Sequence, residues 1–366
     1  MSMVSQVGRA PDKEVEPWRP DRVRRLPKGT FLVAAGAFLI TLALLLPLYV
    51  HDRVVLLPAE ASFDLTMVDD EASYLDTSTW TPVESAELSR TTRVDATAHG
   101  SDWSAWEMTV NTSVAEEVID HWSRRVIVNR ETARAVNCCG EHVDGDRAVR
   151  QAGLVLNWPP GVSEDDHSFY DAEVRAAPSV EFTGEDEVAG LAVREYTQHV
   201  ESTQVPESAR DVPTALFQSG AEGTVSATRW MEAERTFWVE PRTGTVVNME
   251  EHRIESLRPQ NGSGEVALID AELTLDDGHV SGLTQQARAR SLLLQGLDVW
   301  APWSLGPLGA VMVLAGFLKA WRARPSGGEG AAPESASAEN SAPERAEAVD
   351  ATPERAGAAD AAHEGS

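Results

Sequence analysis

The sequence has 366 residues, a formal net charge of −27 and a pI of about 4.6. This excess of acid excludes nucleic acid as a partner, because binding phosphates requires clustered Lys and Arg side chains. Only two cysteines are present, which excludes a small scaffold held together by several disulfides.

The N-terminal part of the chain predicts a membrane anchor. Residues 1–29 form a polar leader, expected to be cytoplasmic and disordered, and residues 30–50 form transmembrane helix 1, since the uncharged run 31–50 can cross a hydrocarbon core of about 30 Å. Arg24, Arg25 and Lys28 before it keep the N-terminus cytoplasmic. The alternative is a cleaved secretory signal, which the length of the run and its lack of a small-x-small cleavage site disfavour.

Residues 51–298 are predicted to form an exported β-rich domain of about 250 residues, enough for one large core or two small ones. The clearest hairpin joins 235–240 to 245–257, and its turn is Pro241, Arg242, Thr243 and Gly244; Pro fixes φ and Gly accepts a positive φ. Alternating apolar and polar residues predict further strands at 85–98, 103–113, 123–129, 194–203 and 265–275.

The C-terminal part predicts a second anchor. A helical pattern at 279–297 leads into transmembrane helix 2 at 299–318, where Pro302 and Pro307 predict a late start or a kink. The basic residues Lys319, Arg322 and Arg324 mark its cytoplasmic end, and the Pro-, Ala- and Glu-rich residues 319–366 are expected to be a cytoplasmic disordered tail. The predicted protein therefore crosses the cell membrane twice, with both termini cytoplasmic and the central domain extracytoplasmic.

These elements define the predicted fold class. It is α+β, with a mainly antiparallel β-sheet in the exported domain and a transmembrane helix on either side of it. Gly36 and Gly309, one in each apolar run, would let the two helices approach closely. The lipid bilayer is thus the first expected partner, and the sequence indicates no oligomeric state.

The two cysteines, Cys138 and Cys139, are adjacent and lie in the exported part, where disulfides persist. A bridge within the chain must therefore be vicinal, and its expected role is to staple a turn that Gly140 makes easier. The alternatives are a pair of buried thiols or a redox role. A zinc site is disfavoured because two adjacent cysteines are a poor ligand set for zinc.

No pattern in the sequence predicts catalysis. It has no nucleophile elbow, no His-Glu-x-x-His and no phosphate-binding Gly loop, so we expect a non-enzymatic protein without catalytic residues, metal or cofactor. Asp165, Asp166 and Asp171 could hold calcium, but they lack EF-hand spacing and are more simply a solvated loop. Glu251 and its neighbours are interpreted as residues on the exposed face of a strand.

Several motifs resemble those of an actinobacterial membrane family, long listed as a domain of unknown function and also labelled the PorA porin family. They are NCCGE at 137–141, GLV at 153–155, HSFYD at 167–171, STQV at 202–205 and TFWVEPRTG at 236–244. The resemblance implies a cell-envelope protein with two terminal spans and an exported β-rich domain, and the porin label implies channel formation. The sequence departs from the family at 157–160, Asn-Trp-Pro-Pro, where a Lys-Phe-Pro-like segment is expected.

The resulting functional hypothesis is an envelope protein whose domain binds or passes hydrophobic or polar solutes, such as an envelope lipid or a small solute. The hairpin resembles that of envelope lipid-carrier domains and the two-span layout is similar to class B scavenger receptors, but these likenesses concern the fold alone. A channel is the alternative, although charged strands suit a membrane barrel poorly. A structural or interaction role is third. The predicted cavity lining is Trp106, Val126, Val128, Tyr196 and Trp238, and a solid core of these residues would instead favour the structural role.

Overall fold

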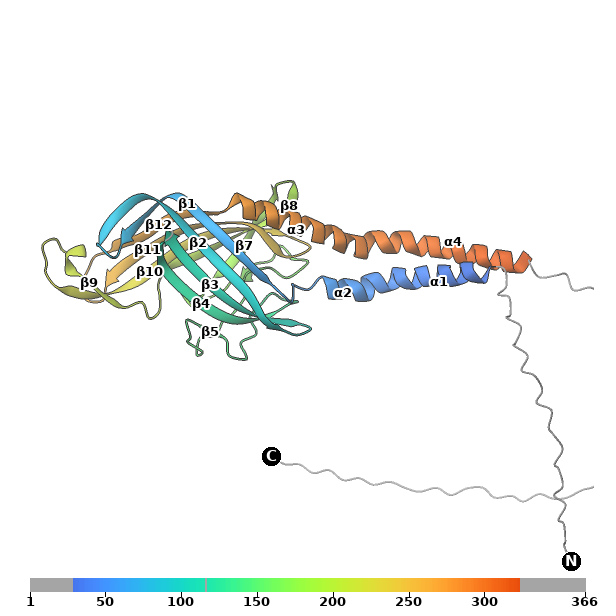
Figure 1. Ribbon diagram of the computed structural model, residues 1–366, viewed down its shortest axis with the longest axis horizontal. Helices are drawn as coiled ribbons and strands as arrows, with labels where there is room; N and C mark the ends of the chain where they lie inside the picture. Colours follow the sequence, from blue (N-terminus) through green and yellow to red (C-terminus); the bar gives the residue numbers. More distant parts are fainter. Residues whose placement is uncertain (1–28, 116, 323–366) are drawn as a thin grey trace, which may run out of the picture. The chain divides into compact units, whose positions relative to one another are not determined.

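The computed structural model describes residues 29–115 and 117–322. The predicted leader, apart from Gly29, and the predicted tail after Arg322 lie outside the described residues. The described part is built from a sheet and two long helices (Figure 1), which confirms the predicted α+β class. The strands are β1 Ser62–Asp76, β2 Thr81–His99, β3 Trp103–Val114, β4 Glu117–Asn129, β5 His142–Val143, β6 His167–Ser168, β7 Ser179–Val188, β8 Leu191–Gln204, β9 Arg210–Pro213, β10 Thr224–Glu240, β11 Thr245–Pro259 and β12 Val266–Leu275.

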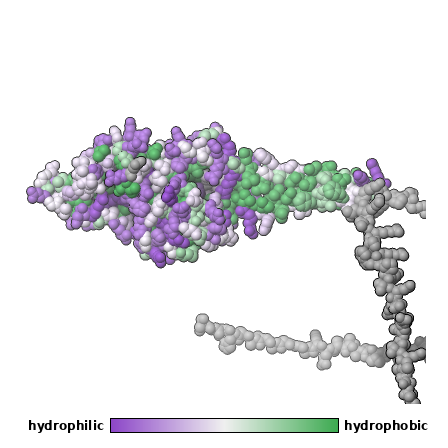
Figure 2. Space-filling model, in the orientation of Figure 1, coloured by the Kyte–Doolittle hydropathy of each residue, from purple (hydrophilic) through white to green (hydrophobic). Residues whose placement is uncertain are grey.

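Both predicted anchors are helices long and apolar enough to cross a membrane. The first contains α1 (Thr30–Leu45) and α2 (His51–Val54), joined by a π-helical turn at Leu46–Val50. The second contains α3 (Asp277–Gln295) and α4 (Ala301–Arg322), joined by a π-helical turn at Gly296–Trp300. Figure 2 shows hydrophobic residues gathered on the surface of these helices, in contrast to the mixed surface of the sheet.

The second helix extends well beyond the expected span at 299–318. It begins at Asp277, capped by Asp276, whose carboxylate accepts hydrogen bonds from the backbone N–H groups of Gly278 (2.9 Å) and His279 (3.4 Å). From there it continues through both prolines to Arg322. The π-helical turn directly before Ala301 accommodates Pro302, since such local adjustments re-satisfy backbone groups that a proline leaves without partners, whereas Pro307 lies inside α4.

The two membrane helices approach each other through glycines, as their small residues predicted. A β-carbon added to Gly36 would lie 2.6 Å from the Gly309 carbonyl oxygen, and one added to Gly309 would lie 2.7 Å from the Gly36 oxygen. Such contact requires glycine on both helices, because any side chain would push the backbones apart.

The sheet is antiparallel, in the order β5-β4-β3-β2-β1-β12-β11-β10-β8-β7-β6, with β9 paired to β10. Strands β4 and β10 are far apart in this order, yet Asp120 on β4 lies 3.1 Å from the guanidinium of Arg229 on β10. The sheet must therefore curl until its distant strands face each other, as the strong twist in Figure 1 also shows.

The interior of the curled sheet is filled by the segment between β4 and β7. Trp158 from this segment is fully buried, with its ring centroid 5.2 Å from those of Tyr196 and Phe237 and 5.8 Å from that of Phe169. Its backbone N–H donates to the carbonyl oxygen of Gly244 (2.9 Å) in the β10–β11 turn. Glycine is required at position 244 for two reasons. Its φ of 69° is unfavourable for other residues, and a β-carbon there would collide with the Trp158 carbonyl.

Candidate functional site

A network of buried charges crosses the interior beside this core. Its centre is Glu173, whose carboxylate accepts hydrogen bonds from Arg90 on β2 (2.7 Å), Arg229 on β10 (3.2 Å) and Arg253 on β11 (2.8 Å). Asp171 positions Glu173, because its side chain accepts the Glu173 backbone N–H at 2.8 Å. Residues separated by about 80 positions along the chain are thus joined by one carboxylate.

Arg253 and Arg235 extend the network along the β10–β11 pair. Arg253 donates to Glu251 (3.0 Å) and Glu255 (2.6 Å) on its own strand, and Ala233 directly opposite leaves room for its side chain. Arg235 lies directly across from Glu251 and donates to it at 2.7 Å. Every second residue of a strand faces the same side, so these alternating charges share one inward face.

The protonation states follow from these contacts. Burial alone would raise the pKa of Glu251, but the charges of Arg235 and Arg253 outweigh burial and lower it to about 2. Burial would likewise raise the pKa of Glu173, and the surrounding arginines hold it well below its usual value. Burial opposes the charge of Arg253, yet its three carboxylate neighbours raise its pKa well above the usual value. Each of these groups is therefore charged at neutral pH.

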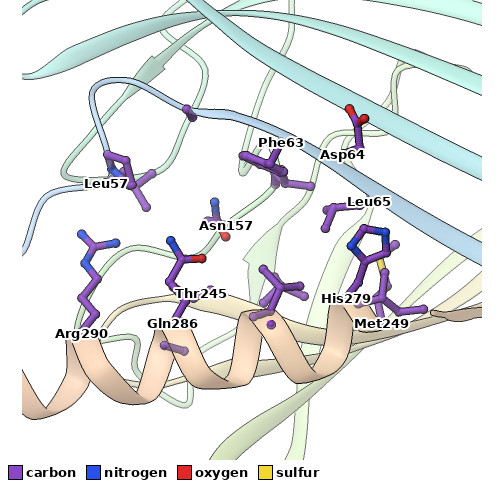
Figure 3. Close-up of a pocket in the computed structure, with 18 of the residues that line it drawn as sticks. Leu57, Phe63, Asp64, Leu65, Asn157, Thr245, Met249, His279, Gln286 and Arg290 are labelled. Atoms are coloured by element: carbon purple, nitrogen blue, oxygen red, sulfur yellow. The ribbon is translucent and has the colours of Figure 1, made fainter. Parts of the chain in front are cut away.

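A cavity of about 530 Å³ lies between α3 and the sheet. Its walls are largely apolar and come from β1, β10, β11, α3 and the segment after β5: Phe63, Leu65, Leu156, Phe237, Met249 and Leu283. Polar side chains also line it: Glu60, Asp64, Asn157, His279, Gln286 and Arg290. In Figure 3, His279, Gln286 and Arg290 project from α3 into this space. We call it the outer cavity.

The geometry of α3 creates the outer cavity. Gly278, Gly282, Gln286 and Arg290 recur every four residues and so share one face of the helix. A β-carbon added to Gly282 would meet no atom within 4 Å, so the absent side chain leaves real space. Arg290 fixes the end of the cavity toward α4, since its guanidinium donates to the carbonyl oxygens of residues 55 and 56 in the linker before β1.

A second, smaller cavity of about 100 Å³ lies beside the charge network. It shares three lining residues with the outer cavity: Leu156, Phe237 and Met249. Arg90, Asp171, Glu173, Arg235 and Glu251 of the network also line it, as do Trp122, Arg124 and Tyr170. We call it the inner cavity.

The five residues expected to line a cavity lie elsewhere. Trp106, Val126, Val128 and Tyr196 are fully buried in the aromatic core with Trp158, while Trp238 packs beside α3 against Val193, Val247 and Ala287. None of the five lines the outer or the inner cavity. Trp106, Val126, Val128 and Tyr196 pack instead against residues of the segment 130–178, such as Trp158, whereas Trp238 packs against α3.

The predicted turn and disulfide are both present. Residues 241–244 join β10 to β11, with Glu240 paired to Thr245. The carboxylate of Glu240 accepts the Thr243 N–H at 2.8 Å and the Thr243 hydroxyl at 2.7 Å, which fixes the turn. Cys138 and Cys139 form a vicinal disulfide, followed by Gly140 with a φ of 87°.

Two expectations about acidic residues are wrong. Asp171 was expected in a solvated loop, but its side chain is buried and lies 2.7 Å from the guanidinium of Arg235. Glu251 was expected on an exposed face, but it is buried between Arg235 and Arg253. Both carboxylates have cationic partners that are distant in sequence or on a neighbouring strand, and these partners offset the cost of burying them. No group of three or more metal-binding side chains occurs within residues 29–115 and 117–322.

The charge network was missed, although the sequence carries a signal for it. Arg229 and Arg235 alternate in step with the apolar residues of β10, and Glu251, Arg253 and Glu255 alternate in step with those of β11. Opposite charges on the same inward face of two paired strands predict buried ion pairs. The contribution of Glu173 carries no such local signal, because it lies in an irregular segment.

Comparison with known proteins gives three findings. Residues 28–318 match the family described as Porin PorA. A Porin PorA of Corynebacterium resistens is 20% identical over 280 residues, covering 59% of this chain and 68% of that protein. The crystal structure of an exported protein with YmcC-like fold from Bacteroides fragilis aligns with this chain at 9% sequence identity, over 60% of this chain and 96% of that one. The TM-score of 0.19 is too low to support an argument.

The family match indicates a porin-type membrane protein, and the structure gives it two helices long and apolar enough to span a bilayer with a large antiparallel β-sheet between them in sequence. Since the family match covers most of the chain, from before the first span to the end of the predicted second one, the chain belongs to the PorA porin family.

Proposed function

We propose that this protein is a non-enzymatic, two-pass protein of the cell envelope, with cytoplasmic termini, whose extracytoplasmic domain binds a solute with an aliphatic chain. The observation that carries this proposal is the outer cavity of about 530 Å³. Small-molecule sites typically measure roughly 300–1,000 Å³ and combine apolar walls with a few polar groups, and the outer cavity has both properties.

The position of the outer cavity supports a solute that comes from the bilayer. The cavity is lined by α3, which continues as one helix into α4. Arg290, the lining residue of α3 nearest to α4, precedes Val299 by nine residues, or roughly 13 Å along a helix at 1.5 Å per residue. An aliphatic molecule leaving the bilayer would therefore have only a short distance to travel.

The proposal can be tested with a neutral apolar dye, N-phenyl-1-naphthylamine, added to the full chain in phospholipid nanodiscs. Gly282→Trp places a large ring in the outer cavity and should abolish the protein-dependent rise in fluorescence. Gly282→Ala adds one methyl group in open space and should retain most of that rise. Equal fluorescence of the wild type, both variants and empty nanodiscs would contradict binding in the outer cavity.

Channel formation is the second candidate, and membership of the PorA porin family is the observation that favours it. Two helices alone rarely line a pore, so conduction would require several copies of the chain. Reconstitution of the full chain into a planar bilayer should then give discrete conductance steps. Their absence across voltages and protein densities would contradict this candidate. A protein that neither conducts nor binds would leave the structural role, which the packed core around Trp158 supports.

A further inference from the structure

Three of the side chains that line the inner cavity carry a buried hydrogen-bond donor without a partner. The Trp122 Nε1, Arg124 Nη1 and Tyr170 Oη atoms are each buried without a hydrogen-bond partner among the described residues, and all three side chains line this cavity. Indole and guanidinium groups can only donate hydrogen bonds. Buried polar atoms normally have partners, so three orphans at one cavity indicate a group that accepts hydrogen bonds.

Arg124 differs from the other buried arginines. Arg90, Arg235 and Arg253 each lie within 3.0 Å of a carboxylate, whereas no carboxylate lies within 4.0 Å of Arg124 among residues 29–115 and 117–322. Arg124 is held instead by neutral groups: its Nη2 donates to the Val155 carbonyl oxygen at 3.0 Å, its Nε donates to the Met108 sulfur at 3.3 Å, and its guanidinium carbon lies 5.9 Å from the centroid of the Tyr170 ring. A buried charge without an ion-pair partner is costly, so binding an anion next to this guanidinium would offset that cost.

The chemistry of the inner cavity favours a carboxylate over a larger anion. Asp171, Glu173 and Glu251 also line it, but arginines already hydrogen-bond or pair with each of them, which leaves Arg124 free. These acids also oppose the entry of a dianion such as phosphate. A carboxylate is planar, singly charged and accepts hydrogen bonds only, and it pairs with guanidinium in a forked geometry.

We propose that the inner cavity binds a carboxylate, with Arg124 as its ion-pair partner and Tyr170 and Trp122 as hydrogen-bond donors. The carboxylate has two sources, a short free acid or the head of a fatty acid. The second source rests on the proposed function: the outer cavity would hold the aliphatic chain, which passes between Leu156, Phe237 and Met249, the residues shared by both cavities.

The test measures ¹³C NMR spectra of [1-¹³C]palmitate and [1-¹³C]acetate with the full chain in phospholipid nanodiscs. A carboxylate in the inner cavity gives a protein-dependent resonance that is distinct from that of lipid-bound acid. Unlabelled hexadecanol, which has the same chain without a charge, should compete about 10- to 100-fold less well than palmitate, as expected for loss of a charge-assisted hydrogen bond.

Two variants locate the site. Arg124→Met should weaken palmitate binding by about 10- to 100-fold, and Tyr170→Phe, which removes only the orphan hydroxyl, by about 3- to 10-fold. Arg125→Met is the matched control, because Arg125 is the next residue of β4, is only partly buried and pairs with Glu107. Its binding should equal that of the wild type. A bound resonance that survives Arg124→Met and Tyr170→Phe unchanged would overturn the proposal.

The remaining outcomes separate this inference from the proposed function. Acetate binding that depends on Arg124, without palmitate binding, would support the inner site for short acids and contradict a chain in the outer cavity. Palmitate and hexadecanol binding equally, both lost in Gly282→Trp, would support the outer cavity and overturn the carboxylate site. Binding of neither acid, with the orphan donors satisfied by water alone, would also overturn it.

Discussion

Arg253 and Arg124 are both buried guanidiniums in the same interior, yet their surroundings are opposite. Arg253 contacts three carboxylates, which raise its pKa despite burial. Arg124 contacts none within 4.0 Å in the described part of the chain, and burial lowers its pKa to about 10. Burial alone therefore does not define the role of an arginine. Arg253 belongs to a closed ion network that stabilises the fold, whereas Arg124 has no ion-pair partner and is available to a ligand in the adjacent cavity.

The largest expected effect is on the closed network. Arg253→Met leaves three buried carboxylates without their shared cation and should lower the free energy of unfolding by about 3–5 kcal/mol. Denaturant titration of the full chain, followed by tryptophan fluorescence, measures this loss. The control is Arg258→Met on the same strand, whose partly exposed pair with Glu265 contributes less than about 1 kcal/mol. Equal losses in both variants would show that the network has no special role.

Acid should weaken the same network. The folded-state pKa of Glu251 is about 2, below the ordinary value of 4.5, so the folded protein binds fewer protons than the unfolded chain between these values. Its stabilisation is complete above pH 4.5 and is lost as the pH falls toward 2, a change on the order of 3 kcal/mol. Glu173 acts in the same direction. Denaturant midpoints that stay constant from pH 6 to pH 2.5 would contradict this assignment.

Arg124 should behave differently from Arg253 in the same denaturation assay. Arg124→Met removes a buried charge that has no ion pair, and the gain offsets the lost hydrogen bonds to the Val155 carbonyl and the Met108 sulfur and the lost contact with the Tyr170 ring. We expect a change within about 1 kcal/mol in either direction. A loss as large as that of Arg253→Met would mean that Arg124 belongs to the structural network and would abolish the contrast between the two arginines.

The smallest effect concerns the wall of the outer cavity. Gly282→Ala adds a methyl group where nothing lies within 4 Å and improves helix propensity, so it should stabilise the protein by about 0.5–1 kcal/mol. Thermal unfolding monitored by far-UV circular dichroism would detect the corresponding rise in Tm. A lower Tm would show that Gly282 is needed for contact rather than for space.

Local pattern predicted much of the fold, for identifiable reasons. The turn 241–244 and the strands that it joins were found because turn residues and period-two alternation are local signals. The helical pattern at 279–297 and the span at 299–318 were predicted as neighbouring segments, and the structure joins them in one helix, 277–322, through a π-helical turn. Strands β1 and β7 were missed since their many acidic residues obscure the alternation.

The site was harder to predict because its contacts are tertiary. The alternation that placed Val126 and Val128 inside also places Arg124 inside, so one member of the inner site could have been found. Tyr170 and Glu173 lie in an irregular segment, where no periodicity indicates which side chains are buried. The outer cavity depends on where α3 crosses the sheet, which depends on packing and not on local sequence.

The most direct test of the central claim is native mass spectrometry of the full chain, purified from an exporting host and released from detergent micelles. Binding in the outer cavity predicts a mass excess of one molecule per chain, identified after solvent extraction as a compound with an aliphatic chain, and its loss in Gly282→Trp but not in Gly282→Ala. A ligand-free mass for the wild type, or an identical mass excess in Gly282→Trp, would contradict the claim.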